Sequence, residues 1–186
     1  MHIMIDFASL PRLETDRLIL RSWRERDIPA FAEMSADAEV MRFFPSTLSA
    51  DQSSAVIAAI QERIRETGYG FHAVEEKASG DFVGFVGLSV PNFEADFLPA
   101  VEIGWRIARP HWRKGFAKEA AREALRHGVE DRGLREIISI APTINRPSIS
   151  VMQAIGMQRE LEGDFIHPAL PEDSPLQPLE LWRFRP

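Results

Sequence analysis

The chain has 186 residues, no cysteine and a formal net charge of −6. This length predicts one domain, spanning residues 1–186. The absence of cysteine excludes thiol nucleophiles, thiolate metal sites and disulfides, and the acidic balance argues against a protein that holds nucleic acid through its phosphates. No apolar run reaches the roughly 18 residues of a membrane helix, and the N-terminus lacks the features of a signal peptide. We therefore expect a cytoplasmic protein that binds neither nucleic acid nor a membrane.

The first third of the chain predicts one strand followed by two helices. Residues 17–21 hold a short apolar run between charged ends, which is typical of a strand. Asp27 is a suitable N-cap and a proline follows it closely, so the pattern predicts a helix over residues 27–36. A second helix is expected to begin near Ser49, because apolar residues then recur at spacings of three and four, and to end at Gly68.

The middle of the chain predicts three strands and one long helix. The strands are expected at residues 71–75, 81–90 and 101–107, the first two of them joined as a hairpin. A basic loop, residues 109–115, leads into the longest helical pattern, residues 116–131. This helix carries a face of small residues, mostly alanine.

The last third of the chain predicts a strand at residues 136–141, a short helix with Ser148 as its N-cap, and two closing strands at 157–162 and 179–185. The connection between the closing strands, residues 163–178, is rich in proline and has no predicted element. The resulting order of elements suits the α/β class, with a mixed central sheet and helices on both of its faces.

The basic loop is the strongest candidate for a binding site. The start of a helix offers unpaired N–H groups and a partial positive charge, which together favour an anion. Gly115 lets the backbone approach a ligand closely, and Arg113 and Lys114 add positive charge. The pattern predicts a phosphate or pyrophosphate site, and an ordinary basic loop before a helix is the alternative. The loop matches neither the Walker loop nor the dinucleotide fingerprint.

This stretch resembles motif A of the GNAT N-acyltransferase superfamily, whose pyrophosphate loop reads (Q/R)-x-x-G-x-(G/A). Gly115 and Ala117 match the last two fixed positions, whereas Trp112 stands where the superfamily has Gln or Arg. A tryptophan at this place resembles the pattern P-x-W-G-K-G-Y-A-x-E-A of the RimJ/RimL-type branch. That branch is named for enzymes that acetylate the N-termini of ribosomal proteins.

Other segments resemble the same branch and occur in the same order. Residues 14–21 resemble its opening strand, residues 80–87 its hairpin strand, and residues 145–157 its N-x-x-S … L-G-F segment. The resemblance covers about residues 12–162. It implies the GNAT fold, in which a central, mostly antiparallel, twisted sheet is splayed between its fourth and fifth strands. These correspond here to the predicted strands on either side of the long helix.

The resemblance also implies acetyl-CoA as co-substrate, held in that split. Its pantetheine arm would pair with the fourth strand, at Ile103, Trp105 and Ile107. Its diphosphate would meet backbone N–H groups of the loop. The loop residues implied in this way are Arg113, Lys114, Gly115, Phe116 and Ala117. Asn145 would hold the pantetheine amides, and Ser148 would lie near the thioester sulfur and protonate the leaving thiolate.

The implied reaction is direct attack of a primary amine on the thioester in a ternary complex. A general base is expected, because the amine is largely protonated near neutral pH. Glu102 is the candidate, since alternation along the strand places it on the same face as Gly104 and Arg106. A solvated carboxylate on a strand is the alternative interpretation. A backbone N–H of the fourth strand is expected to stabilise the oxyanion.

The position of residues in the family architecture also implies where the amine acceptor would bind. The residues expected to contact the acceptor are Phe43, Tyr69, His72 and His167. The sequence leaves open whether the acceptor is the α-amine of a peptide N-terminus or a small amine. The histidines show no metal-ligand spacing, so we expect no metal site.

The sequence does not fix the oligomeric state or decide between catalysis and binding alone. A homodimer formed through the last strands is compatible with the pattern. A non-catalytic acyl-CoA-binding module is the alternative to an enzyme. Such a module would need Gly115 and Asn145 but not Glu102.

Overall fold

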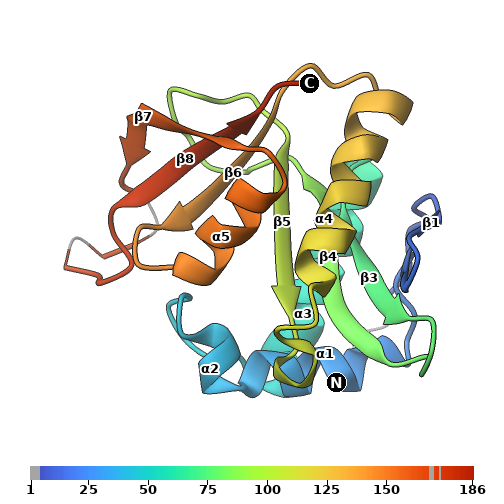
Figure 1. Ribbon diagram of the computed structural model, residues 1–186. Helices are drawn as coiled ribbons and strands as arrows, with labels where there is room; N and C mark the ends of the chain where they lie inside the picture. Colours follow the sequence, from blue (N-terminus) through green and yellow to red (C-terminus); the bar gives the residue numbers. More distant parts are fainter. Residues whose placement is uncertain (1–4, 168–169, 172) are drawn as a thin grey trace.

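The computed structural model describes residues 5–167, 170–171 and 173–186. Within this part of the chain, one sheet of 8 strands has the order β1-β2-β3-β4-β5-β6-β8-β7 (Figure 1). The strands are β1 (Leu13–Glu14), β2 (Leu18–Arg21), β3 (Phe71–Glu76), β4 (Phe82–Ser89), β5 (Glu102–Ile107), β6 (Ile137–Pro142), β7 (Gln158–Phe165) and β8 (Leu179–Phe184). The helices are α1 (Asp27–Ala36), α2 (Ala38–Met41), α3 (Ala50–Thr67), α4 (Phe116–Arg126) and α5 (Arg146–Ala154), with a 3-10 turn η1 (Arg109–His111) and a π-helical turn η2 (His127–Asp131). None of the described helices is long and apolar enough to cross a membrane.

The sheet is antiparallel except between β5 and β6. β5 and β6 run parallel, and their ladder consists of one residue pair, Glu102 with Ile138. The Ile138 N–H donates to the Val101 carbonyl at 2.9 Å at this end. Beyond it the two strands diverge, as Figure 1 shows by the angle between β5 and β6. The predicted α/β class and the predicted splay of the sheet are therefore confirmed.

Helices cover both faces of the sheet, also as predicted (Figure 1). On one face, α4 and α5 pack on an aliphatic core that includes Ile103. The small side chains of Ala120 and Ala124 let α4 lie close to the strands, because close-packed interiors leave few voids. On the other face, α1 and α3 pack on an aromatic core around Trp23 and Phe85. The split between β5 and β6 therefore opens between two packed layers of helices.

Asp27 does not have the predicted role of a helix N-cap. Its carboxylate is buried and accepts hydrogen bonds from Arg21 Nη1 at 2.7 Å and Nη2 at 2.9 Å. Arg21 Nε donates to Glu75 at 2.8 Å. Buried charges need such partners, and this cluster joins β2, β3 and the start of α1. The prediction failed because the Asp27 carboxylate pairs with Arg21 and accepts from the Arg24 N–H, and the helix N-cap is Arg26 instead.

Several element boundaries also differ from the prediction. α5 begins at Arg146, and its N-cap is Asn145, whose Oδ1 accepts from the Ser148 N–H at 3.2 Å. The predicted cap role of Ser148 is therefore wrong, because Pro147 fits into the first turn of a helix and the helix starts before it. β1 and α2 are too short for periodicity to reveal. β7 continues to Phe165, so the predicted loop 163–178 begins later, and its residues 168, 169 and 172 lie outside the described part of the chain.

Candidate active site

A cleft of ≈ 570 Å³ opens where β5 and β6 diverge. Its walls are the end of β5, the loop that leads into α4, the start of α5 and the region around α2. The lining residues are Glu39, Val40, Arg42, Phe43, Phe44, Trp105, Arg106, Ile107, His111, Trp112, Arg113, Gly115, Phe116, Ala117, Lys118, Asn145, Pro147, Ser148 and Val151. The structure thus brings together residues that the sequence motif suggested from three separate segments of the chain.

The loop before α4 is anchored to the end of β5 by Trp112. Its indole Nε1 donates to the Ile107 carbonyl at 2.7 Å. Two residues of this loop have left-handed backbone conformations, Arg113 with φ 61° and Gly115 with φ 82°. Turns of this kind direct successive N–H groups toward one concave side. The tryptophan that departs from the superfamily pattern therefore has a structural role, which is to fix the loop at the mouth of the cleft.

The first N–H groups of α4 have no acceptor in the part of the chain that the structure describes. These are the N–H groups of Phe116, Ala117 and Lys118. The intrahelical ladder begins only with the Glu119 N–H, which donates to the Gly115 carbonyl at 3.1 Å. Gly115 is the N-cap and has no side chain with which to cap them. Unpaired N–H groups at a helix start, together with the helix dipole, form a site for an anion.

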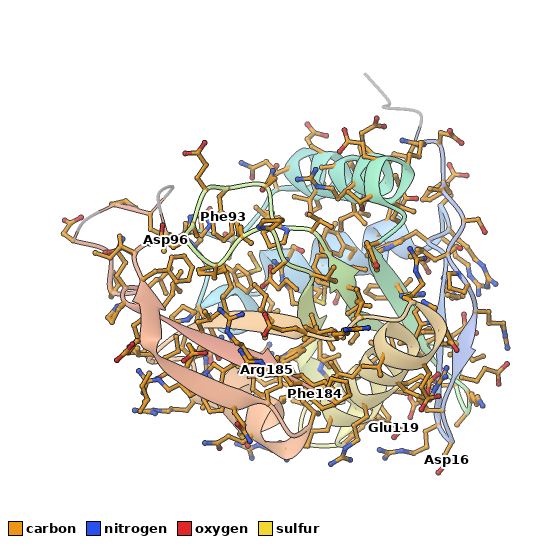
Figure 2. All side chains as sticks on the ribbon, turned by 90° about the horizontal axis from the view of Figure 1, so that it is seen from above. Asp16, Phe93, Asp96, Glu119, Phe184 and Arg185 are labelled. Carbon is orange, nitrogen blue, oxygen red and sulfur yellow. The ribbon has the colours of Figure 1, made fainter. Side chains whose placement is uncertain are left out.

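Glu119 braces this end of α4 against the turn between β1 and β2. Its carboxylate accepts hydrogen bonds from Thr15 Oγ1 at 2.5 Å and from Arg17 Nε at 2.7 Å. Arg17 Nη1 also donates to the Lys114 carbonyl at 3.0 Å. Figure 2 shows Glu119 on the same edge of the molecule as Asp16, the residue between these two partners. Burial alone would raise the pKa of Glu119, but the hydrogen bonds outweigh it and lower that pKa. The carboxylate is thus neutralised by Arg17 and does not oppose an anion at the helix start.

The backbone of β5 presents free polar groups to the split. The carbonyls of Ile103 and Ile107 point away from β4, because they accept from Ser139 Oγ at 3.0 Å and from Trp112 Nε1 at 2.7 Å. By the alternation of a strand, the N–H and C=O of Trp105 point the same way. The ladder with β6 has already ended at Glu102, so β6 does not pair with the Trp105 backbone. The side chain of Ile103 itself is fully buried in the core.

The start of α5 forms the opposite wall of the cleft. Asn145 Oδ1 is occupied by the Ser148 N–H, which leaves the Asn145 Nδ2 amide group for a ligand. Ser148 lies in the first turn of α5 and lines the cleft, and its hydroxyl makes no hydrogen bond with the described residues. Because Asn145 performs the capping, the Ser148 hydroxyl is available for chemistry.

Glu102 lies at the closed end of the split. It belongs to the single residue pair of β5 and β6, and it is not among the residues that line the cleft. Burial raises the pKa of Glu102 from 4.5 to about 7, and a hydrogen bond with the Ile140 backbone N–H acts in the opposite direction. A carboxylate with such a pKa can accept a proton near neutral pH and is not fully protonated beforehand.

The sequence matches a family model described as an acetyltransferase (GNAT) domain, over residues 17–158. The chain belongs to the GNAT acetyltransferase family. Members of this family use acetyl-CoA and act on amine acceptors. The superfamily predicted from motif A is therefore confirmed.

Individual GNAT relatives agree with this assignment. The chain is 31% identical over 155 residues to the uncharacterized N-acetyltransferase YoaA of Bacillus subtilis, covering 81% of this chain and 84% of YoaA. The GNAT-family acetyltransferase of Bacillus anthracis is similar in structure, with a TM-score of 0.77 at 23% identity over 94% of this chain and 98% of that one. Mycobacterium smegmatis RimJ, solved in complex with CoA-disulfide, gives a TM-score of 0.73 at 19% identity over 96% and 87% of the two chains. The protein is thus an N-acetyltransferase with the GNAT fold.

Two residues that the GNAT resemblance suggested for the acceptor lie away from the cleft. Tyr69 and His72 line a separate small cavity of ≈ 10 Å³ beside Leu13 and His127. His72 is buried, its Nε2 lies 3.0 Å from the Pro11 carbonyl, and burial lowers its pKa to about 4. The structure places both residues among core contacts, so we do not assign them to acceptor binding.

His167 and Lys114 are also absent from the cleft lining. The His167 ring lies 4.4 Å from that of Phe93 and 6.5 Å from that of Phe165, in an aromatic cluster between the β4–β5 connection and the end of β7. Lys114 Nζ lies 5.7 Å from the centre of the Phe116 ring. Phe43, by contrast, does line the cleft, and the Arg42 guanidinium lies 4.7 Å from its ring centre.

The sequence motifs suggested no site role for Arg106, which the structure places in the GNAT cleft. Phe44 and Arg106 line it beside Phe43. Strand alternation places Arg106 on the same face as Glu102, but only the structure shows that this part of β5 does not pair with β6. In the described part of the chain, no group of three or more His, Asp or Glu side chains is arranged to hold a metal ion.

Proposed function

We propose that this N-acetyltransferase binds acetyl-CoA in the cleft between β5 and α5 and transfers its acetyl group to a primary amine by direct attack. The observation that carries the proposal is the row of unpaired N–H groups of Phe116, Ala117 and Lys118, which opens on that cleft. A diphosphate fits such a row, because it supplies several anionic oxygens to donors that otherwise lack partners. Arg113 and Lys118 add positive charge beside it.

The pantetheine arm has matching partners further into the cleft. The free N–H and C=O of Trp105 can pair with its amide groups, as one more strand would. Asn145 Nδ2 can donate to an amide carbonyl from the opposite wall. The split in the sheet therefore supplies the polar groups that an extended diamide chain requires.

Acetyl-CoA supplies a thioester carbonyl carbon for the amine to attack, and residues of this chain manage the protons. Glu102 accepts the proton that the amine loses, through a water molecule, because it lies behind the cleft lining. Ser148 donates its hydroxyl proton to the leaving thiolate and regains a proton from water in the cleft. The raised pKa of Glu102 and the absence of a hydrogen bond from the Ser148 hydroxyl to the described residues support these roles.

The acceptor is a peptide N-terminal α-amine or a small primary amine. The tryptophan in the loop and the other segments that resemble the RimJ/RimL-type branch support assignment to that branch. The similarity to RimJ concerns the fold alone. Phe43 and Phe44, on the α2 side of the cleft, are the side chains that we assign to the acceptor wall.

The proposed function is tested by the release of free CoA thiol from acetyl-CoA in the presence of a panel of primary amines. The expected result is thiol release with at least one class of amine, together with a mass increase of that amine by one acetyl group. Asn145→Leu should weaken acetyl-CoA binding, because it removes the amide group that faces the cleft. A folded protein that neither binds acetyl-CoA nor releases thiol with any amine would refute the proposal.

A further inference from the structure

Arg106 is an unusual cation in the wall of the cleft. Its Nη1 donates to Ser35 Oγ at 3.3 Å, and its Nε is buried and has no partner. The guanidinium lies 4.2 Å from the centre of the Phe44 ring and 5.3 Å from that of Phe85. Burial lowers its pKa to about 10, so it stays charged at neutral pH. Its Nη2 group makes no hydrogen bond with the described residues, and Arg106 lines the cleft.

No carboxylate neutralises this charge in the part of the chain that the structure describes. The buried Arg21 shows the usual arrangement, since it is held by both Asp27 and Glu75. The carboxylate nearest to Arg106 in the cleft lining is that of Glu39, and it pairs with Arg42 at 3.4 Å. Burying a guanidinium without a carboxylate partner costs free energy. The planar arrangement of its N–H donors matches a planar anion such as a carboxylate.

The cleft as a whole is basic, although the chain carries a net charge of −6. Its lining holds the cations of Arg42, Arg106, Arg113 and Lys118 against the single carboxylate of Glu39. Arg113 and Lys118 flank the start of α4, where the diphosphate is assigned. Arg106 lies on the other side of β5, because its neighbours Ser35 and Phe85 belong to the α1 face. The positive charge thus forms two separate centres.

We propose that Arg106 binds a carboxylate of the acceptor, so the acceptor is a small amine that also carries a carboxylate, as an amino acid does. This inference rests on the proposed function and narrows its substrate class. It disfavours polyamines, whose several positive charges would enter a cleft that is already basic. Arg–carboxylate pairs supply geometric specificity as well as energy, and the rings of Phe43 and Phe44 leave an apolar surface for the rest of the acceptor.

The experiment compares matched pairs of amines in the thiol-release assay: glycine, leucine, phenylalanine and glutamate, each with its carboxamide, and spermidine. The amine of each carboxamide is less basic than that of the acid, so a larger fraction of it is neutral and reactive. Without recognition of the carboxylate, the carboxamide should therefore be the faster substrate. We expect at least one acid to exceed its carboxamide in kcat/KM by about 10- to 100-fold, as for a hydrogen-bonded charged pair. Arg106→Met should abolish that ratio, and Arg106→Lys should keep part of it.

Arg63→Met is the matched control, because Arg63 pairs with Glu66 at 3.0 Å on α3, outside the cleft lining, and the charge removed is the same. It should leave the acid-to-carboxamide ratio unchanged. Acetyl-CoA binding by calorimetry should be the same within about two-fold in wild type and Arg106→Met.

Three results would overturn the inference while the proposed function stands. The first is an acid-to-carboxamide ratio of one or less for every pair, and the second is a ratio that survives Arg106→Met. The third is a large loss of acetyl-CoA affinity in Arg106→Met, which would assign Arg106 to the co-substrate. Failure of wild type to bind acetyl-CoA would instead refute the proposed function itself, and this inference with it.

Discussion

The indole N–H of Trp112 donates to the backbone carbonyl of Ile107 at 2.7 Å. This bond joins the loop before α4 to the last residue of β5, and both residues line the cleft. It fixes the free N–H groups at the start of α4 relative to the part of β5 that does not pair with β6. The Trp112 side chain therefore helps to hold the two parts of the proposed acetyl-CoA site in register.

Trp112→Phe should weaken acetyl-CoA binding. The ring is retained but the donor is lost, and the Ile107 carbonyl is left without this partner. The cost of one such bond is about 0.5–1.5 kcal/mol, which predicts a rise in Kd of roughly two- to tenfold. Calorimetric titration measures it, with Trp182→Phe as control, because the Trp182 Nε1 donates to Glu180 at 2.9 Å away from the cleft. Equal affinities in Trp112→Phe and wild type would contradict the anchoring role.

Glu102→Gln should lower kcat more than it raises the KM for acetyl-CoA. A positioned general base contributes typically about 10²–10⁴-fold, so a loss in that range is expected. In wild type, activity should rise with pH through about 7, where the Glu102 carboxyl loses its proton. The variant should lack this inflection and show only the titration of the amine. A pH–rate profile shared by both proteins would exclude Glu102 as the base.

The same substitution should stabilise the fold at alkaline pH. The pKa of Glu102 is raised by burial from 4.5 to about 7, so the native state holds more protons than the unfolded state between these values. The stability of wild type therefore falls as pH rises across this window. Glu102→Gln removes that loss, so its free energy of unfolding should exceed that of wild type by on the order of 1–3 kcal/mol at pH 8. At pH 4 the two proteins should differ little. Urea unfolding at both pH values measures the difference. No gain at pH 8 would show that the carboxylate is better solvated than its position at the end of the split suggests.

Arg21→Met should strongly destabilise the fold. It leaves the carboxylates of Asp27 and Glu75 without their shared cation, and Asp27 is 2% exposed. Removing one partner of a buried ion pair costs about 3–5 kcal/mol. The control is Arg63→Met, since Arg63 pairs with Glu66 on the surface of α3 and should cost at most about 1 kcal/mol. Similar unfolding free energies for the two variants would contradict this account of the buried cluster.

Local patterns were sufficient to predict most of the fold. The apolar spacing of α3 and its cap Ser49, the strand alternation around residues 101–107, and the loop with Gly115 before α4 all predicted elements that the structure contains. Each of these features depends on neighbours in the sequence. The same holds for the loop before α4, whose proposed role as an anion site follows from a helix start and one glycine.

The remaining differences come from side-chain pairing and from the arrangement of the strands, neither of which periodicity reveals. Asp27 has the composition of a cap, but Arg21 binds it instead. His72 lies in β3 and Tyr69 lies two residues before it, and both line a small cavity that is separate from the cleft. Arg106 lines the cleft because the pairing of β5 with β6 ends at Glu102. Nothing in the sequence around Arg106 indicates that the pairing ends there.

The most direct test of the account is the calorimetric titration of acetyl-CoA into wild type, Gly115→Ala and Gly80→Ala. Both glycines have positive φ, 82° and 76°, so alanine imposes a similar backbone strain of about 1–2 kcal/mol at each. Only Gly115 lies in the loop before α4, whereas Gly80 lies in the turn between β3 and β4. The account predicts micromolar binding by wild type and by Gly80→Ala, and a loss of about tenfold or more in Gly115→Ala, for which the unpaired N–H groups must move. Equal loss in both variants, or no binding of millimolar acetyl-CoA by folded wild type, would contradict it.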